Sequence, residues 1–264
     1  MKTANDAMAY TVGGIARLSE GDIDGAIADF NAAIKMDPFF ALPYVHRGVA
    51  YQAKDEMSAA LADFDKAIRI NPKLADAYYY RGLARKKNKD YPSALSDFSR
   101  AIQLNPQFAE AYLHRGSIRR RQNDEQAAYE DFEAAIKFKK DYAEAYNYRG
   151  VMRRDRGQAA EALDDFNTAL KIKPDFIEAL YNRGLARRDV GDLEGAVEDF
   201  TAVLKLNPRL PDVYANRGLV LLQLDREFES QMDINQFLRL RPDKKQKIDQ
   251  AVWEIKYKKR HSNA

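Results

Sequence analysis

Hydrophobic and polar residues recur along this chain with a period of 34 residues. One glycine stands at the same point of every period: Gly14, Gly48, Gly82, Gly116, Gly150, Gly184 and Gly218. Taking this glycine as position 8 divides the chain into seven units without insertions, at 7–40, 41–74, 75–108, 109–142, 143–176, 177–210 and 211–244. A fixed period of this length predicts a repeat architecture with one supersecondary element in each unit.

Each unit carries two stripes at helical spacing. Positions 4, 8 and 11 share one face of a first helix, and positions 20, 24, 27 and 28 share one face of a second. Alanine occupies position 20 in six units and phenylalanine occupies position 24 in six. The small residues at positions 8 and 20 allow the two helices to approach closely, and the phenylalanine fills the remaining space. Because one hairpin cannot bury both of its faces, successive hairpins are expected to stack.

The ends of these helices are also signalled. Gly21, Gly157 and Gly191 fall at position 15, where a glycine cap is expected to end the first helix. An acidic residue follows at position 16 in five units, which suits the start of the second helix. Proline at position 32 in six units prevents that helix from continuing.

A further helix is expected after Pro242. Asp243 and Gln246 have the spacing of a capping box, and an apolar stripe follows at Ile248, Ala251, Val252 and Ile255. We predict an N-terminal extension at 1–6, the seven repeats at 7–244, and a capping helix with a basic tail at 245–264.

The series aromatic, glycine, alanine, aromatic, alanine and proline, at positions 4, 8, 20, 24, 27 and 32, resembles the tetratricopeptide repeat (TPR) family. The resemblance covers about nine tenths of the chain. It implies an all-α fold, a right-handed superhelical solenoid of seven TPR helix-turn-helix hairpins plus a C-terminal capping helix. It also implies a non-catalytic scaffold or adaptor that binds a peptide segment or a partner protein in a concave groove.

Two charged positions are expected to face inward. Position 7 is arginine in six units and position 23 is aspartate in all seven. A buried arginine needs a partner, so we predict a structural ladder of ion pairs rather than a ligand site. Pairing within a repeat would leave Asp29 unpaired and pairing between repeats would leave Asp233 unpaired, so the sequence leaves both schemes open. The ladder comprises Arg47, Arg81, Arg115, Arg149, Arg183 and Arg217 with Asp63, Asp97, Asp131, Asp165 and Asp199.

The resemblance places positions 2, 5, 6, 9, 12 and 13 in the groove. Position 2 is acidic in five consecutive units and position 12 is basic in four. Acids at a helix start and bases at its end also complement the helix dipole, and this is the alternative explanation of both rims. The candidate groove residues are Tyr79, Asn147, Tyr181, Asn182 and Asn216 between the rims, with Lys86, Arg120, Arg154 and Arg188 on the basic rim.

Asn182 and Asn216, both at position 6, resemble the asparagine ladder of O-GlcNAc transferase repeats. An amide both donates and accepts, so it can bind an extended backbone of any sequence. The carboxylate clamp of chaperone-tail binders needs lysine and asparagine at positions 5 and 9, and no unit has that pair. We therefore expect a protein or peptide partner, acidic where the basic rim takes part, and chaperone C-terminal tails are disfavoured.

Charge adds one qualification to this picture. From Arg241 onward, eight basic residues oppose three acidic ones, a net of +5, and the rest of the chain carries −2. The overall charge of +3 therefore comes from the tail, and nucleic-acid binding is not indicated by it. Two alternatives remain open: self-association through exposed repeat faces, and RNA or anionic-surface binding through Lys256–His261 and the basic rim.

The sequence offers little for catalysis. It has no cysteine, which excludes disulfides and thiol chemistry, and it contains no P-loop, GxSxG or HExxH motif. We expect no enzyme activity, no metal and no cofactor. No stretch is apolar over the length of a membrane span. A cytoplasmic location is therefore the default expectation, although a removed leader would be invisible.

Overall fold

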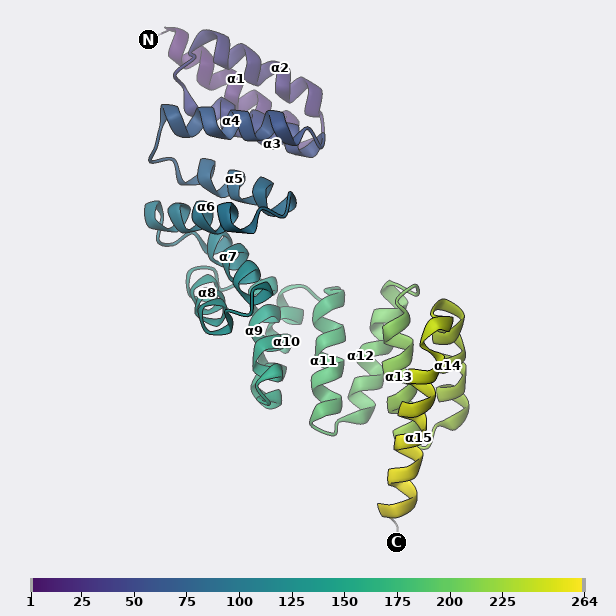
Figure 1. The fold of residues 1–264 in the computed structure, drawn as a ribbon. Coiled ribbons are helices and arrows are strands. Elements are labelled where there is room, and N and C mark those ends of the chain that lie inside the picture. Colours follow the sequence, from purple (N-terminus) through teal and green to yellow (C-terminus); the bar gives the residue numbers. More distant parts are fainter. Residues whose placement is uncertain (1, 263–264) are drawn as a thin grey trace. The chain divides into compact units, whose positions relative to one another are not determined.

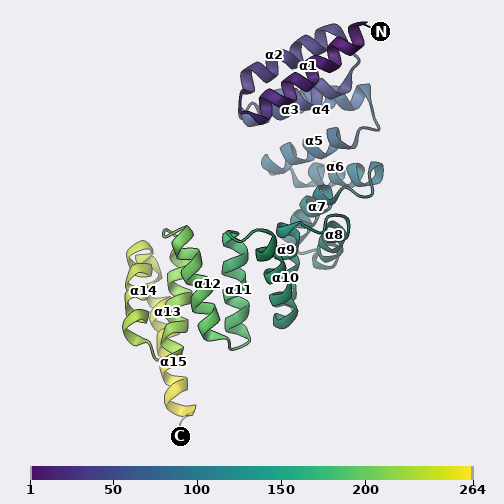
Figure 2. The ribbon, with the colours of Figure 1, turned by 180° about the vertical axis from the view of Figure 1, so that it is seen from behind.

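The computed structural model describes residues 2–262, and within that range every regular element is a helix. The chain forms two compact units, one up to Lys139 and one from Lys140 on (Figures 1 and 2). This confirms the all-α helical repeat fold. The predicted extension at 1–6 continues the first helix from Lys2, and residues 1, 263 and 264 lie outside the described range.

Unit 1 is built from four helical hairpins. Within the unit, the second helix of each of the first three hairpins packs against the first helix of the next one. The helices are α1 (Lys2–Ser19), α2 (Ile23–Met36), α3 (Ala41–Ala53), α4 (Met57–Ile70), α5 (Ala75–Lys87), α6 (Tyr91–Leu104), α7 (Ala109–Arg121) and α8 (Glu125–Phe138).

Unit 2 contains three hairpins and a last helix that packs against α13. That last helix takes the place of a further hairpin, and Ile248 buries itself beside Ile234 and Phe237. The elements are α9 (Ala143–Asp155), α10 (Ala159–Ile172), α11 (Ile177–Asp189), α12 (Leu193–Leu206), α13 (Pro211–Gln223), α14 (Glu227–Leu240), the short 3-10 helix η1 (Pro242–Lys244) and α15 (Lys245–Ser262).

Position 15 ends every first helix in the left-handed conformation. The three glycines predicted as caps have φ of 86°, 78° and 85°, which confirms that prediction. The other four hairpins make the same turn with Asp55, Lys89, Asn123 and Asp225, at φ near 62°. Only glycine adopts this conformation freely, so the fold imposes it on the other four residues.

The acidic residues at position 16 cap only some of the second helices. Asp22, Asp90 and Asp192 each accept a hydrogen bond from the backbone N–H three residues on. Glu56 and Asp124 make no such side-chain bond.

The predicted capping box of the last helix is wrong. Asp243 lies in η1 and accepts from Arg241 Nε and Nη2, at 3.0 and 3.2 Å, and α15 begins two residues later. An adjacent guanidinium outcompetes the backbone N–H groups because a charge-assisted, bidentate pair is the stronger interaction.

Six of the seven hairpins close around a glycine–phenylalanine contact, and in the seventh Ile234 faces Gly218. The phenylalanines at position 24 are fully buried, at 0 % exposure. A Cβ atom added at Gly14 would lie 2.6 Å from Cε1 of Phe30, and 2.7 Å separates the corresponding atoms at Gly184 and Phe200. The two helices can approach this closely only because position 8 has no side chain.

We expect Gly14→Ala to lower the free energy of unfolding by about 1–3 kcal/mol, since the enclosed ring of Phe30 cannot move aside. The adjacent Gly13→Ala is the matched control, because its Cβ would meet only Asp29 Oδ2 at an ordinary 3.4 Å. That change should instead stabilise the helix by about 0.5–1 kcal/mol. Denaturant melts measure both, and equal effects of the two changes would contradict the packing argument.

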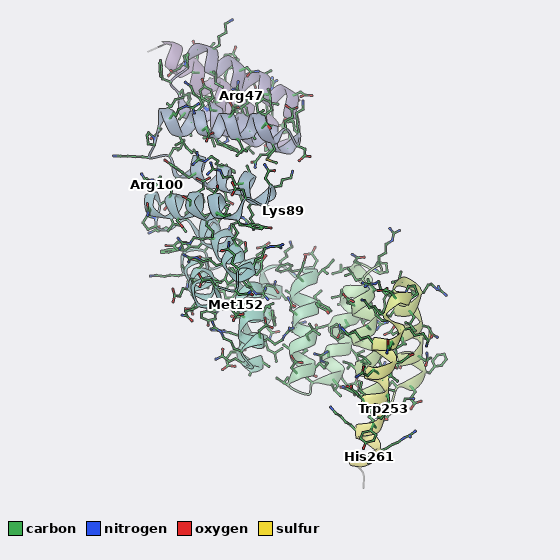
Figure 3. All side chains as sticks on the ribbon, viewed as in Figure 1. Arg47, Lys89, Arg100, Met152, Trp253 and His261 are labelled. Carbon is green, nitrogen blue, oxygen red and sulfur yellow. The ribbon has the colours of Figure 1, made fainter. Side chains whose placement is uncertain are left out.

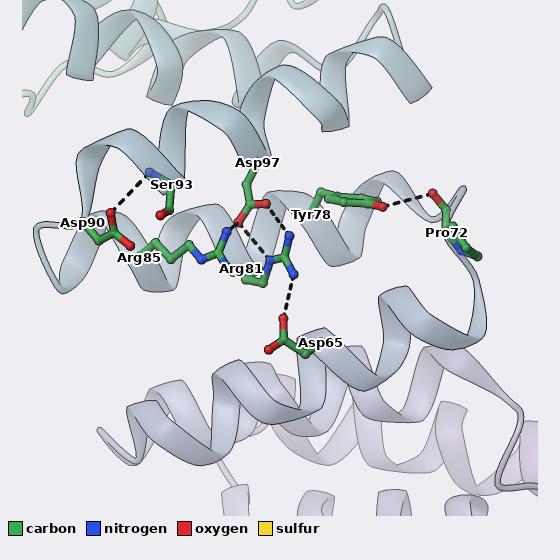
Figure 4. Close-up of polar contacts among 8 residues, drawn as sticks. All are labelled: Asp65, Pro72, Tyr78, Arg81, Arg85, Asp90, Ser93 and Asp97. Atoms are coloured by element: carbon green, nitrogen blue, oxygen red, sulfur yellow. Dashed lines mark hydrogen bonds and ion pairs between the residues drawn. The ribbon is translucent and has the colours of Figure 1, made fainter.

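The buried aspartates of the second helices are held by arginines of the same hairpin. Arg81 donates from Nε and Nη2 to the two carboxylate oxygens of Asp97, at 3.0 and 2.6 Å (Figure 4). The same two-bond geometry joins Arg47 to Asp63, Arg115 to Asp131, Arg149 to Asp165, Arg183 to Asp199 and Arg217 to Asp233.

In most of these pairs, a second arginine, at position 11 of the same first helix, also forms an ion pair with the aspartate. Arg85 Nη1 donates to Asp97 at 2.8 Å, and the equivalent pairs are Arg119–Asp131, Arg153–Asp165 and Arg187–Asp199. The expectation that within-repeat pairing leaves Asp29 alone is wrong, because Arg17 at position 11 lies 3.2 Å from it. Position 11 is arginine in five repeats, and it contacts the buried aspartate although its spacing also fits the packing stripe of the first helix.

The ladder arginines also reach the preceding hairpin. Arg81 Nη1 donates to Asp65 on α4 at 2.6 Å (Figure 4). Arg115 reaches Ser99 and Arg217 reaches Thr201 in the same way. One guanidinium therefore joins both helices of its own hairpin and the second helix of the hairpin before it.

We expect Asp165→Ala to lower the free energy of unfolding by about 3–5 kcal/mol, because it strands two arginine head groups in a largely buried site. Asp165 is 2 % exposed and accepts from Arg149 and Arg153 at 2.7–3.1 Å. The neighbouring Asp164 is exposed, so Asp164→Ala is the control and should change stability little. A urea melt of Asp165→Ala close to wild type would argue against the ladder as a stabilising device.

Candidate functional site

The candidate site is the surface formed by positions 2, 5, 6, 9, 12 and 13 of the first helices, which we call the helix-A face. In unit 1 it is carried by α3, α5 and α7, and in unit 2 by α9, α11 and α13. The two faces are described separately because they carry different chemistry.

On unit 2, polar side chains of three first helices form two separate hydrogen-bonded groups, which together we call the amide row. Asn182 Nδ2 donates to Asn147 Oδ1 at 3.0 Å, joining α11 to α9. Asn216 Nδ2 donates to the Tyr181 hydroxyl at 2.9 Å, joining α13 to α11. Arg188 Nη1 donates to Asn216 Oδ1 at 3.1 Å. The structure thus brings together five of the nine predicted groove residues.

The members of this row differ in the hydrogen-bonding capacity that they retain. Asn216 uses both amide hydrogens, on Tyr181 and on the carbonyl of Asp212. Asn147 is 7 % exposed. Asn182 is partly exposed and makes a single bond to the described residues, so one amide hydrogen and its carbonyl oxygen remain for a ligand.

A cavity of about 350 Å³ adjoins the row, between α11, α13, α14 and α15. Tyr181 and Asn216 line it together with Leu219, Phe237 and Ile248. These apolar side chains can receive a side chain of a bound peptide, and the charged residues Asp212, Arg241, Lys244 and Lys247 also line the cavity.

In unit 2, aspartates of the same unit lie beside the arginines of the basic rim. Arg188 Nη2 lies 3.0 Å from Asp189, and Arg154 lies 3.4 Å from Asp155 and 3.8 Å from Asp189. Both aspartates stand at position 13. Arg154 Nη1 is buried and has no hydrogen-bond partner among the described residues.

On unit 1, aromatic rings surround Tyr79. This tyrosine is 9 % exposed, and its ring centroid lies 4.7 Å from that of Phe108 and 5.9 Å from that of His114. Burial raises the pKa of its hydroxyl. Tyr79 therefore lies mainly in the core of the stacked hairpins, with only an edge on the surface.

Lys86 lies next to this cluster. Its Nζ donates to Ser117 Oγ at 2.8 Å and lies 3.3 Å from His114 Nδ1. Burial lowers the pKa of Lys86, and burial with the nearby Lys86 charge lowers the pKa of His114 to about 4. The remaining predicted rim residue, Arg120, is partly buried on α7.

The basic tail is partly engaged by its own unit. Lys256 lies 3.6 Å from Glu227, and Lys259 Nζ donates to Asp225 at 2.6 Å. The rings of Trp253, Tyr257 and His261 stack along the outside of α15, which carries two of the labels in Figure 3. Among the described residues, no helix has the length and apolar content needed to cross a membrane.

The low pKa of His114 predicts a pH dependence. The native protein holds this ring neutral down to about pH 4, whereas the unfolded chain takes up the proton near pH 6.5. Stability is therefore lost as the pH falls below 6.5, and this group should cost about 2 kcal/mol between pH 7 and pH 5. Denaturant melts of wild type and His114→Gln at both pH values measure the difference. Equal pH dependence in the two proteins would contradict the assignment.

Comparisons with known proteins agree with this architecture. Models of the tetratricopeptide repeat match residues 75–108, 9–40 and 109–142, and a TPR repeat model matches 53–89, 150–188 and 185–225. No curated protein sequence matches the chain significantly.

Solved structures share the fold at low sequence identity. The Cut9–Hcn1 complex of the APC/C matches with a TM-score of 0.72 at 17 % identity, over 93 % of this chain and 48 % of the other. The chain thus spans about half the length of that match. PilF of Pseudomonas aeruginosa matches with a TM-score of 0.74 at 17 % identity, over 79 % and 95 % of the two chains. The TPR protein YrrB matches with a TM-score of 0.56 at 23 % identity, over 68 % and 92 %.

The repeated helical hairpins, the motif residues at their junctions and the models that match most of the chain lead to one conclusion: the chain belongs to the tetratricopeptide repeat family.

Proposed function

We propose that the helix-A face of unit 2 holds an extended peptide segment of a partner protein, and that the chain acts as a non-catalytic scaffold or adaptor. The TPR fold itself indicates a protein-interaction scaffold. The observation that carries the finer proposal is the amide row across α9, α11 and α13.

The row suits a peptide backbone. Successive first helices present Asn147, Asn182 and Asn216, with Asn182 bonded to Asn147 and Asn216 bonded to Tyr181. A backbone offers a donor and an acceptor in every residue, and Asn182 retains one group of each kind. Hydrogen bonds within the row hold the amides in place before a ligand arrives, which reduces the entropy lost on binding.

The adjoining cavity supplies a place for a side chain. Leu219, Phe237 and Ile248 give it an apolar wall, while Asn216 and Tyr181 lie at its border with the row. Backbone bonds with one apolar anchor are a common way to bind extended segments with modest sequence selectivity. YrrB, which shares the fold, is a TPR protein with an unusual peptide-binding site, so this fold is compatible with such a role.

The test uses peptides selected against the wild-type protein from a random library, with affinities measured by fluorescence anisotropy. Asn182→Ala removes groups that bind backbone, so it should weaken unrelated selected peptides alike. The loss of about 1 kcal/mol expected for one hydrogen bond corresponds to roughly fivefold in Kd.

Asn235 provides the control. It is an exposed asparagine on α14 whose side chain bonds only within that helix, to Gln231. Asn235→Ala should leave every affinity unchanged. Wild-type affinity in Asn182→Ala, or a loss confined to a single peptide sequence, would refute backbone binding at this row.

A further inference from the structure

The helix-A face of unit 1 holds a cation whose contacts are all neutral. Lys86 Nζ is bound by the Ser117 hydroxyl at 2.8 Å and lies 3.3 Å from the imidazole Nδ1 of His114. Among the described residues, no carboxylate lies within ion-pair distance of it. Burial alone accounts for the lowered pKa of this lysine, with no neighbouring acid to oppose it.

The contrast with unit 2 shows why this is unusual. There, the position 12 arginines lie beside Asp155 and Asp189 at position 13. In α5, position 13 is Lys87, so the corresponding internal acid is missing. Lys87 itself finds a partner in Asp55, at 2.6 Å. A partly buried charge without a counter-charge is costly, and a ligand that brings an anion removes that cost.

The surroundings of Lys86 restrict which anion fits. Because Nδ1 of His114 accepts from the ammonium group, the ring proton is on Nε2, and that N–H has no acceptor among the described residues. The ring lies between Phe98 and Tyr79, with centroids at 5.8 and 5.9 Å. Lys86 lies at the Nδ1 edge of the ring, away from that N–H, so one carboxylate cannot accept from both, and the site offers a single positive charge beside an aromatic wall.

We propose that Lys86, positioned by His114 and Ser117, is a subsite for the carboxylate of an aspartate or glutamate side chain in a bound acidic segment. The subsite rests on the proposed function, extended from unit 2 to the helix-A face of unit 1. A single positive charge matches a carboxylate monoanion. A phosphate group, with a charge of about −1.5 to −2 at neutral pH, would leave part of its charge unbalanced.

The test uses a fluorescein-labelled peptide of alternating glutamate and serine, a matched peptide with glutamine at every glutamate, and a third with phosphoserine at those positions. Each is titrated into the full chain at low salt. Wild type should bind the glutamate peptide roughly tenfold more tightly than the glutamine peptide, the ratio that corresponds to about 1.4 kcal/mol. Lys86→Gln should remove that preference.

Lys87→Gln is the matched control, because it removes the same charge one residue away from an exposed side chain that already has a partner. It should leave the preference intact. An equal loss in both variants would show general electrostatic attraction and overturn the subsite. A phosphoserine peptide that binds more tightly than the glutamate peptide in wild type, but not in Lys86→Gln, would overturn the carboxylate assignment.

An NMR measurement tests directly whether the peptide contacts Lys86. The lysines are methylated with 13C, and the NMR signal of Lys86 is assigned by its absence from the Lys86→Gln spectrum. The glutamate peptide should change the chemical shift of the Lys86 methyl groups and leave that of the Lys87 methyl groups unchanged. No shift would overturn the proposal. Asn182→Ala distinguishes the two hypotheses. If wild type binds the glutamate and glutamine peptides equally, and Asn182→Ala weakens both, the unit 2 proposal is supported and the Lys86 subsite is refuted.

Discussion

The buried carboxylate at position 23 is the constraint on which the rest of the hairpin depends. Asp97 is 2 % exposed, and a charge at that depth is tolerated only with several donors aimed at it. Arg81 and Arg85 supply them from two successive turns of α5. This arrangement fixes the register of the two helices, because a shift of one residue in either would separate the pair. The glycine–phenylalanine contact then sets how closely they approach.

The same fold carries two different surfaces because groove positions vary more than the ladder positions, where aspartate occurs in all seven units and its main arginine in six. At position 13, unit 2 has Asp155 and Asp189, which place a carboxylate beside each of its position 12 arginines, although Arg154 Nη1 keeps no hydrogen-bond partner among the described residues. The α5 helix of unit 1 has Lys87 at that position, which leaves Lys86 with neutral partners. The basic rim is continuous in the sequence, but its arginines in unit 2 have carboxylates beside them, whereas Lys86 has none within ion-pair distance among the described residues. Charge type alone does not identify a binding site; the partner of each charge does.

The repeat fold could be predicted from the sequence because its determinants are local and occur seven times. Glycine, phenylalanine and proline at fixed spacing specify the same type of helical hairpin in successive repeats. The site was less accessible, because it depends on which side chains meet across helices. The sequence shows the arginines at position 11, but it does not show that they pair with the aspartates at position 23. The ion pair of Arg17 with Asp29 is one of these pairs. Similarly, Asp243 fits a capping box by spacing, yet Arg241 takes its carboxylate. Spacing fixes which backbone groups are near, whereas competition between side chains decides which bonds form.

The contact of five ladder arginines with the preceding hairpin has a consequence for how the array opens. In repeat arrays, stability divides into the intrinsic stability of each unit and the coupling between neighbours. Here the coupling includes one bond to position 25 of the preceding hairpin, where Asn167, Ser99, Thr201 and Asp65 occur. Only the last of these is charged. A mutation at this site on the second helix can therefore strengthen or weaken a single junction without disturbing the buried pair. The order in which hairpins separate can evolve through residues outside the core.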